Sequence, residues 1–304
     1  MQKYKVNISL LIAVIMITLS SCEIEDRVIE LPEHDSRLVL NAQIYQADTT
    51  MNIILTESMG ITDTFLRTEN IELRNSSKIT LFTPDEGAID GYIYKEPNLS
   101  ENVKTPFWKF DYNNFLEGET YVIEAEADGY DQVRSEVTIP MPANLVDVEV
   151  NLQEADETRF FTRDRFEITI DDPAGEENYY LIEATREIED NGFFFTRRYR
   201  FYDSPENPID ESFLENRISV LSDKNFNGTE YSFVAYGERG SQRFSEIKFN
   251  IYQITKEAYE YQLAFEKANT DSPFAEPVTF PNNIEAGYGI FSITSKPAIK
   301  IIQI

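Results

Sequence analysis

Few side chains in this 304-residue chain could carry out catalytic chemistry. The chain has one histidine, His34, and one cysteine, Cys22. His34 lies in the predicted tether, within Pro32-Glu33-His34-Asp35, and Cys22 is assigned to a lipid below, so a Ser/His/Asp triad, a Cys/His pair and a zinc site built on histidine each lack parts. The 54 acidic residues could supply two carboxylates for glycoside hydrolysis, but such a pair is defined by its separation in space, which a sequence does not give. We predict that the protein is not an enzyme and needs no cofactor, and we keep a carboxylate-based glycosidase as a remote alternative.

One segment follows the spacing of the first half of a calcium-binding loop. Asp223, Asn225 and Asn227 alternate, and Gly228 follows them. Oxygen ligands at alternating positions wrap a hard cation, and the glycine allows a sharp turn. The twelfth position, where a bidentate glutamate belongs, is Val234. The segment is therefore read either as a weak calcium site or as a turn rich in Asp and Asn.

Two arginines are expected to face each other across a β-hairpin. The dipeptide Asn191-Gly192 between two apolar stretches predicts a two-residue type I′ turn. That turn places Arg186 opposite Arg197 on the mostly apolar side of the hairpin, where like charges are unfavourable. An internal Asp or Glu between them, or two side chains that extend to the rim of the sheet, would relieve the repulsion. An anionic ligand or partner group docked there is the alternative.

The same register predicts further pairs on both faces of the hairpin. They are Glu187 with Thr196 and Glu183 with Arg200 on one face, and Ile188 with Phe195, Ala184 with Tyr199 and Ile182 with Phe201 on the other.

The start of the chain predicts a secreted lipoprotein. Lys3 and Lys5 precede a short apolar run over residues 10–17, which is too short to span a bilayer. Leu19, Ser20, Ser21 and Cys22 follow and resemble a lipobox, in which the cysteine thiol takes a diacylglycerol and becomes the new N-terminus. Several acyl chains, palmitate among them, anchor a protein stably where one does not. We predict a signal peptide over residues 1–21 and lipid attachment at Cys22.

Residues 22–36 are predicted to form an acidic tether. Glu23-Ile24-Glu25-Asp26 resembles the export tags of lipoproteins carried to the outer face of Bacteroidota outer membranes, and a merely solvated tether is the alternative reading. We expect the protein on the cell outer membrane, lipid-anchored and facing the exterior.

The charge balance excludes nucleic acid as a partner. The formal net charge is −27, from 27 basic and 54 acidic residues. Phosphate backbones and anionic lipid surfaces would both repel such a chain. The single cysteine also excludes a disulfide within one chain.

The body of the chain reads as mainly β. Period-two alternation predicts about seven short strands over residues 37–143, as expected for an Ig-like or transthyretin-like sandwich. Pro140 and Pro142 end this unit, and residues 144–304 form a second β-rich domain. One helix is predicted over residues 256–268, with Thr255 as its N-cap. Its expected apolar face comprises Ala258, Tyr261, Phe265 and Ala268.

Several sequence blocks resemble the Bacteroidota lipoprotein family catalogued as domain of unknown function 4249. The most specific is Asn283-Ile284-Glu285-Ala286-Gly287-Tyr288-Gly289-Ile290-Phe291, in which a smaller apolar residue would be expected between the two glycines. The other blocks are residues 37–42, 118–121, 129–130, 139–140, 222–228 and 273–277. The resemblance implies an outer-membrane lipoprotein often associated with TonB-dependent transporters, with no agreed activity and no catalytic residues to carry over.

These observations together predict a non-enzymatic accessory or binding component of a TonB-dependent nutrient-uptake system. The alternative is a surface adhesin or glycan-binding module, for which Phe193, Phe194 and Phe195 beside the hairpin turn are candidate contacts. Its expected partners are the membrane, through the lipid, and an outer-membrane transporter.

Overall fold

The computed structural model describes nine ranges of the chain. They are residues 34–46, 51–59, 76–94, 107–153, 162–190, 193–203, 220–239, 244–268 and 278–304. Ser36–Ile304 form one compact unit. The predicted signal peptide, the lipobox and most of the tether lie outside the described residues.

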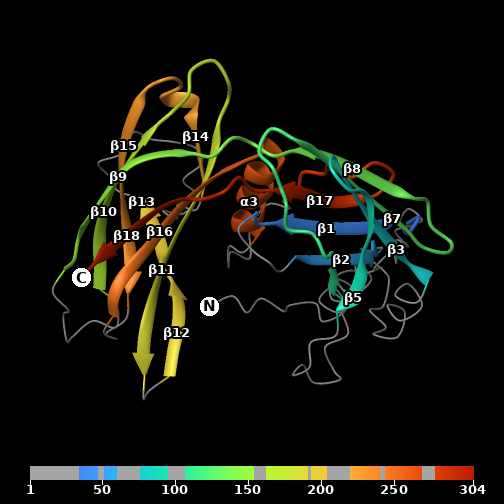
Figure 1. Ribbon diagram of the computed structural model, residues 1–304, viewed down its shortest axis with the longest axis horizontal. Helices are drawn as coiled ribbons and strands as arrows, with labels where there is room; N and C mark the ends of the chain where they lie inside the picture. The colour runs from blue at the N-terminus through green and yellow to red at the C-terminus, as the bar shows by residue number, and fades with distance from the viewer. Residues whose placement is uncertain are drawn as a thin grey trace, which may run out of the picture. The chain divides into compact units, whose positions relative to one another are not determined.

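Alternating apolar residues build a first β-sandwich from two sheets (Figure 1). One sheet has the order β17 (Tyr288–Ile293), β1 (Leu38–Ile44), β2 (Asn52–Glu57), β6 (Phe107–Lys109) and β5 (Tyr92–Tyr94). The other has the order β4 (Gly87–Asp90), β3 (Lys78–Thr83), β7 (Thr120–Glu126) and β8 (Val133–Thr138). On β1 the alternate residues Leu38, Leu40, Ala42 and Ile44 are buried, as the period of two requires. The mainly β prediction is confirmed.

The strand β17 shows that the predicted boundaries were wrong for the C-terminal segment. It pairs with β1 in parallel, although about 250 residues separate them. Ile284, Phe291 and Ile293 belong to the core of the first sandwich. Residues 144–304 are therefore not one separate domain, because this segment completes the sandwich that begins at β1. Local patterns cannot predict such pairing.

Two more sheets form the second sandwich. One has the order β13 (Arg200–Asp203), β15 (Glu230–Arg239), β10 (Thr162–Asp171) and β9 (Asn144–Asn151). The other has the order β12 (Phe193–Arg198), β11 (Tyr179–Asp190), β16 (Phe244–Ile254) and β18 (Ala298–Gln303), and β14 (Val220–Ser222) also pairs with β11. Phe166 and Ile168 on β10 and Ala184 on β11 share one buried cluster, so the two sheets pack face to face. A short 3₁₀ helix, η1 (Asp223–Asn225), follows β14.

The hairpin of β11 and β12 confirms most of the predicted register. Arg186 pairs with Arg197, Glu187 with Thr196 and Ile188 with Phe195. The Tyr199 N–H then donates to the carbonyl of Ala184 at 2.8 Å.

Beyond Tyr199 the predicted pairs were wrong. Glu183 does not pair with Arg200, nor Ile182 with Phe201, because the chain crosses at Tyr199 to the opposite sheet. There β13 pairs with β15, so that Phe201 lies opposite Gly237. A Cβ at Gly237 would lie 2.7 Å from the Tyr199 ring, so glycine makes room for the crossing.

The helix α3 (Lys256–Ala268) has the predicted bounds. The Ala258 N–H donates to Oγ1 of Thr255 at 3.3 Å, which confirms the N-cap. The predicted buried face was partly wrong. Ala258 and Tyr261 are half-buried, but Phe265 is 50% exposed and Ala268 is exposed, while the buried residues are Tyr259 and Ala264. Tyr259 packs in a cluster with Val220, Tyr252 and Ile254, and these neighbours select the face. In the part of the chain that the structure describes, no helix has the length and apolar character to cross a bilayer.

Candidate functional site

The most unusual side chain of the second sandwich is Arg186 on β11. It alternates in phase with Ala184 and Ile188, which face the core, so it points between the two sheets. Only 6% of the residue is exposed. Its Nε and Nη1 atoms are buried without a hydrogen-bond partner. Burying a charged group whose N–H donors have no acceptor costs free energy. Such a group therefore indicates a position where a hydrogen-bond acceptor could bind.

Aromatic rings, not carboxylates, surround this guanidinium. The Arg186 Cζ lies 4.7 Å from the ring centroid of Tyr199 and 5.8 Å from that of Phe244. Both distances lie within the range of a cation–π interaction. Within the described residues, no carboxylate accepts a hydrogen bond from Nε or Nη1 of Arg186. The rings supply part of the stabilisation that an ion pair would have given.

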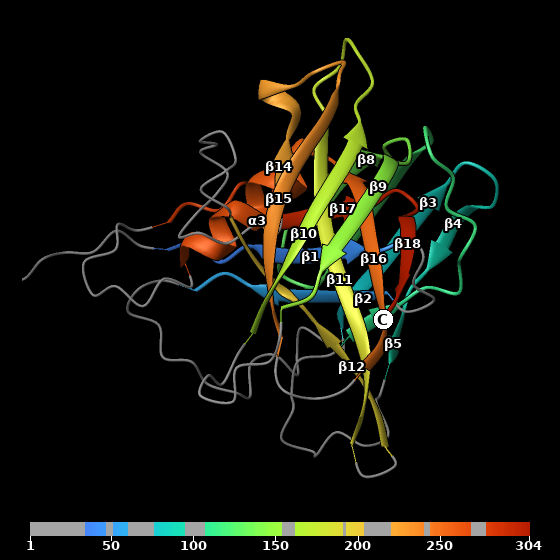
Figure 2. The ribbon, with the colours of Figure 1, turned by 90° about the vertical axis from the view of Figure 1, so that its left-hand side faces the viewer.

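Arg197 lies directly opposite Arg186 in the hairpin, as predicted. Its side chain is exposed, so it lies at the rim while Arg186 lies deeper. Figure 2 shows the hairpin of β11 and β12, and the two arginines pair part-way along it. Directly opposed residues on one face have Cβ atoms about 5 Å apart, so the two like charges repel unless an anion lies between them.

Asp164 is the acidic residue that sequence reasoning missed at this end. It is fully buried on β10, in phase with Phe166 and Ile168. Its Oδ1 accepts the backbone N–H of Gln153 at 3.1 Å, and its Oδ2 accepts the Tyr199 hydroxyl at 3.5 Å. Tyr199 thus donates to the buried carboxylate while its ring faces Arg186. The signal was available, because Asp164 continues the inward positions of an apolar strand.

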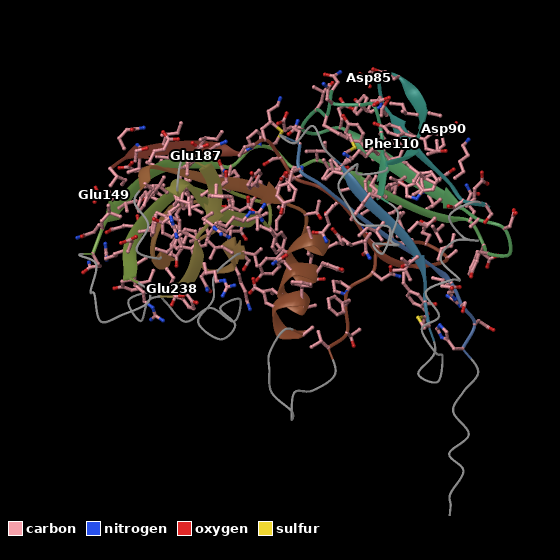
Figure 3. The ribbon with its side chains drawn as sticks, turned by 90° about the horizontal axis from the view of Figure 1, so that it is seen from below. Asp85, Asp90, Phe110, Glu149, Glu187 and Glu238 are labelled. Carbon is pink, nitrogen blue, oxygen red and sulfur yellow. The ribbon has the colours of Figure 1, made fainter. Side chains whose placement is uncertain are left out.

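Other arginines of this sandwich have acidic partners on the sheet surfaces. Arg163 pairs with Glu238 at 3.3 Å, Arg165 with Glu167 at 2.8 Å and Arg198 with Glu183 at 3.1 Å. The labelled Glu187 and Glu238 in Figure 3 come from opposite sheets of this sandwich. None of these three pairs involves Arg186 or Arg197.

The predicted calcium loop is held by other contacts. Oδ2 of Asp223 accepts the backbone N–H of Asn178 at 2.8 Å and the Asn178 side-chain amide at 3.3 Å. Asn227 accepts from the Gly175 N–H at 3.1 Å and donates to the Glu176 carbonyl at 2.8 Å, while Asn225 is exposed. The side chains of Asp223 and Asn227 therefore tie the segment around η1 to the turn before β11. Within the described ranges, no cluster of three or more His, Cys, Asp or Glu side chains is arranged to hold a metal ion.

A second buried carboxylate completes this polar network. Asp172 accepts the Gly228 N–H at 2.8 Å and the hydroxyl of Tyr180. Burial raises the pKa of Asp223, and the nearby Asp172 charge raises it further. Burial and the Asp172 carboxylate likewise raise the pKa of the Tyr180 hydroxyl. The network is internally bonded, so we assign it to holding the loops.

The block over residues 283–291 is a structural joint between distant strands. Asn283 donates from Nδ2 to the Phe291 carbonyl at 2.7 Å and accepts the Phe291 N–H at Oδ1 at 2.9 Å. A Cβ at Gly287 would lie 2.5 Å from the Leu38 carbonyl oxygen, and one at Gly289 only 2.1 Å from that of Leu40. These close approaches explain both glycines.

A protein-family model matches nearly the whole chain. The model described as "Domain of unknown function (DUF4249)" matches residues 24–298. The chain belongs to this family. The match spans both sandwiches and the joint at residues 283–291. No curated protein matches the DUF4249 chain.

Several other residues that the sequence singled out in this DUF4249 chain lie outside the described ranges, and others are exposed. Leu19, Ser20, Ser21 and Cys22 lie outside the described residues, as do residues 273–277 and the side chains of Phe193 and Phe194. Phe195 is 46% exposed. Tyr288 is 42% exposed with the Arg37 guanidinium 5.8 Å from its ring centroid. Because its side chain points outward, a large residue fits between the two glycines.

Proposed function

We propose that this DUF4249 protein is a non-enzymatic, lipid-anchored binding or accessory component of an envelope complex on the outer membrane, serving a TonB-dependent nutrient-uptake transporter. The observation that carries the proposal is the Leu19-Ser20-Ser21-Cys22 sequence directly behind the short apolar run. Lipid attachment at Cys22 would hold a strongly acidic body at a membrane surface that its charge does not favour.

The body offers surfaces suited to binding. Within the described strands, β18 is an edge strand that pairs only with β16, and Lys300 on it bonds to Asp147 of β9 at 2.9 Å. Ile299 and Ile301 on this strand are 49% and 54% exposed. Edge strands and exposed apolar side chains are common features of interaction surfaces.

A surface adhesin or glycan-binding module is the second candidate. It is favoured by Phe195, which is 46% exposed beside the hairpin end. An exposed aromatic face can stack on an apolar ligand surface.

Affinity purification tests the first proposal. The tagged, lipidated protein is recovered from gently solubilised outer membranes, and a Cys22→Ala variant provides the mislocalised control. We expect a TonB-dependent transporter at near-stoichiometric amounts with the wild type and its loss with Cys22→Ala. Recovery of the lipoprotein alone would contradict the accessory role, and binding to a glycan array would then favour the second candidate.

A further inference from the structure

The guanidinium group of Arg186, buried in the second sandwich, lacks hydrogen-bond acceptors. Arg186 is more than nine-tenths buried, and neither Nε nor Nη1 has an acceptor. Guanidinium groups stay charged at every physiological pH, so deprotonation cannot relieve the cost. Buried charges in proteins are paired or hydrogen-bonded, because desolvation otherwise costs several kcal/mol per ion.

The side chains around Arg186 offset the cost of burying its charge only in part. The rings of Tyr199 and Phe244 attract the cation but accept none of its N–H groups in the plane of the guanidinium. Arg197, directly opposite, adds repulsion. Asp164, which is buried on β10, accepts the Tyr199 hydroxyl and the Gln153 N–H, and neither Nε nor Nη1 of Arg186 bonds to it.

We propose that Arg186 and Arg197 bind the carboxylate group of a small ligand between the sheets of the second sandwich. The buried Arg186 would form the charge-assisted hydrogen bonds. Arg197 would hold the second side of the group from the rim. The rings of Tyr199 and Phe244 form an apolar wall for the body of the ligand. This inference does not rest on membrane anchoring or on any transporter.

The surroundings favour a monoanion over a phosphate. The chain carries a net charge of −27, which repels a dianion more strongly than a monoanion. A carboxylate also matches the planar guanidinium in a bidentate geometry. A ligand with one carboxylate on an apolar stem therefore fits the site best.

Binding of sodium benzoate by the full chain in mild detergent tests the proposal. Titration calorimetry and the thermal unfolding midpoint are measured at constant ionic strength, with sodium chloride and sodium phosphate as comparison salts. Arg186→Met removes the charge while keeping an apolar stem, and Arg197→Gln removes the rim charge. Arg200→Met is the matched control, because Arg200 is exposed on β13 outside the site.

We expect benzoate, and not chloride, to raise the unfolding midpoint of the wild type and of Arg200→Met. Arg186→Met should weaken benzoate binding at least tenfold while its ligand-free form unfolds at the same or a higher temperature, because an unpaired buried charge is removed. Arg197→Gln should weaken binding by a smaller factor. Arg197→Gln also keeps the test decisive if Arg186→Met does not fold.

Three results would overturn the proposal. They are no effect of benzoate beyond that of chloride, unchanged benzoate binding in both variants, and stronger Arg186-dependent binding of phosphate than of benzoate. The affinity purification then separates two sources of the carboxylate. If Arg186→Met recovers the same proteins as the wild type, the group belongs to a free ligand. If it loses one protein, the group belongs to that partner.

Discussion

Replacing Gly289 by alanine tests whether the parallel joint between β17 and β1 holds the first sandwich together. Gly289 has a φ of +119°, which L-residues rarely adopt. Its would-be Cβ lies 2.1 Å from the Leu40 carbonyl oxygen and 3.1 Å from the Leu40 nitrogen. Because both obstacles are backbone atoms, no side-chain rotation can make room, and β17 must move away from β1.

The expected cost has two parts. Backbone strain in a rarely populated region costs about 1–3 kcal/mol. Separating the strands around the Leu40–Gly289 pair loses roughly two hydrogen bonds, at about 0.5–1.5 kcal/mol each. We therefore expect Gly289→Ala to lower the free energy of unfolding by about 4 kcal/mol, a large share of the stability of an ordinary domain.

Gly129→Ala is the matched control. Gly129 also has a positive φ, +86°, but nothing lies within 4 Å of its would-be Cβ. Only conformational strain remains there, at about 1–2 kcal/mol. Urea unfolding followed by the fluorescence of Trp108 provides the assay, because this sole tryptophan is buried in the same core. Equal losses in the two variants would refute the argument that the joint is sterically closed.

Two further predictions concern buried polar groups. Asn283→Ala should cost about 2–4 kcal/mol, because it removes both hydrogen bonds to the Phe291 backbone. Urea unfolding measures this against Asn225→Ala, a change at an exposed asparagine, and a loss no larger than that of the control would contradict it. For Asp223, the raised pKa means that its contribution is most favourable below the unfolded value of about 3.9 and is lost as the pH rises through the folded value. The stability of wild type relative to Asp223→Asn should therefore fall as the pH is raised from the acid range to neutrality, and the opposite slope in urea titrations at several pH values would disprove the burial argument.

Short-range features of the fold could be predicted well. The helix α3 was correctly bounded because Thr255 provides a cap and the following residues favour helix. The hairpin register around Arg186 and Arg197 followed from Asn191-Gly192, because a two-residue turn fixes which residues face each other. The helix face was missed, since burial depends on what packs against a helix. The neighbours of Tyr259 come from β14 and β16, elsewhere in the chain.

The candidate site was predicted in part for the same reason. The opposition of two arginines is a local consequence of the hairpin, and the sequence predicted it. Other side chains near Arg186 are distant from it in sequence, because Phe244 comes from β16 and Asp164 from β10. The Tyr199 ring follows from the predicted hairpin, which pairs it with Ala184, whereas Phe244 and Asp164 come from strands that no local spacing could have brought there.

The sequence by itself determined the strands, the helix, the hairpin pairing, the acidic charge and the motif at Cys22. Each depends on residues close together in the chain or on composition. Only the tertiary structure decided that β17 completes the first sandwich, that the chain changes sheets at Tyr199 and that Arg186 is buried without an acceptor. These features arise from contacts between segments far apart in sequence, where packing and desolvation, not local preference, set the free energy.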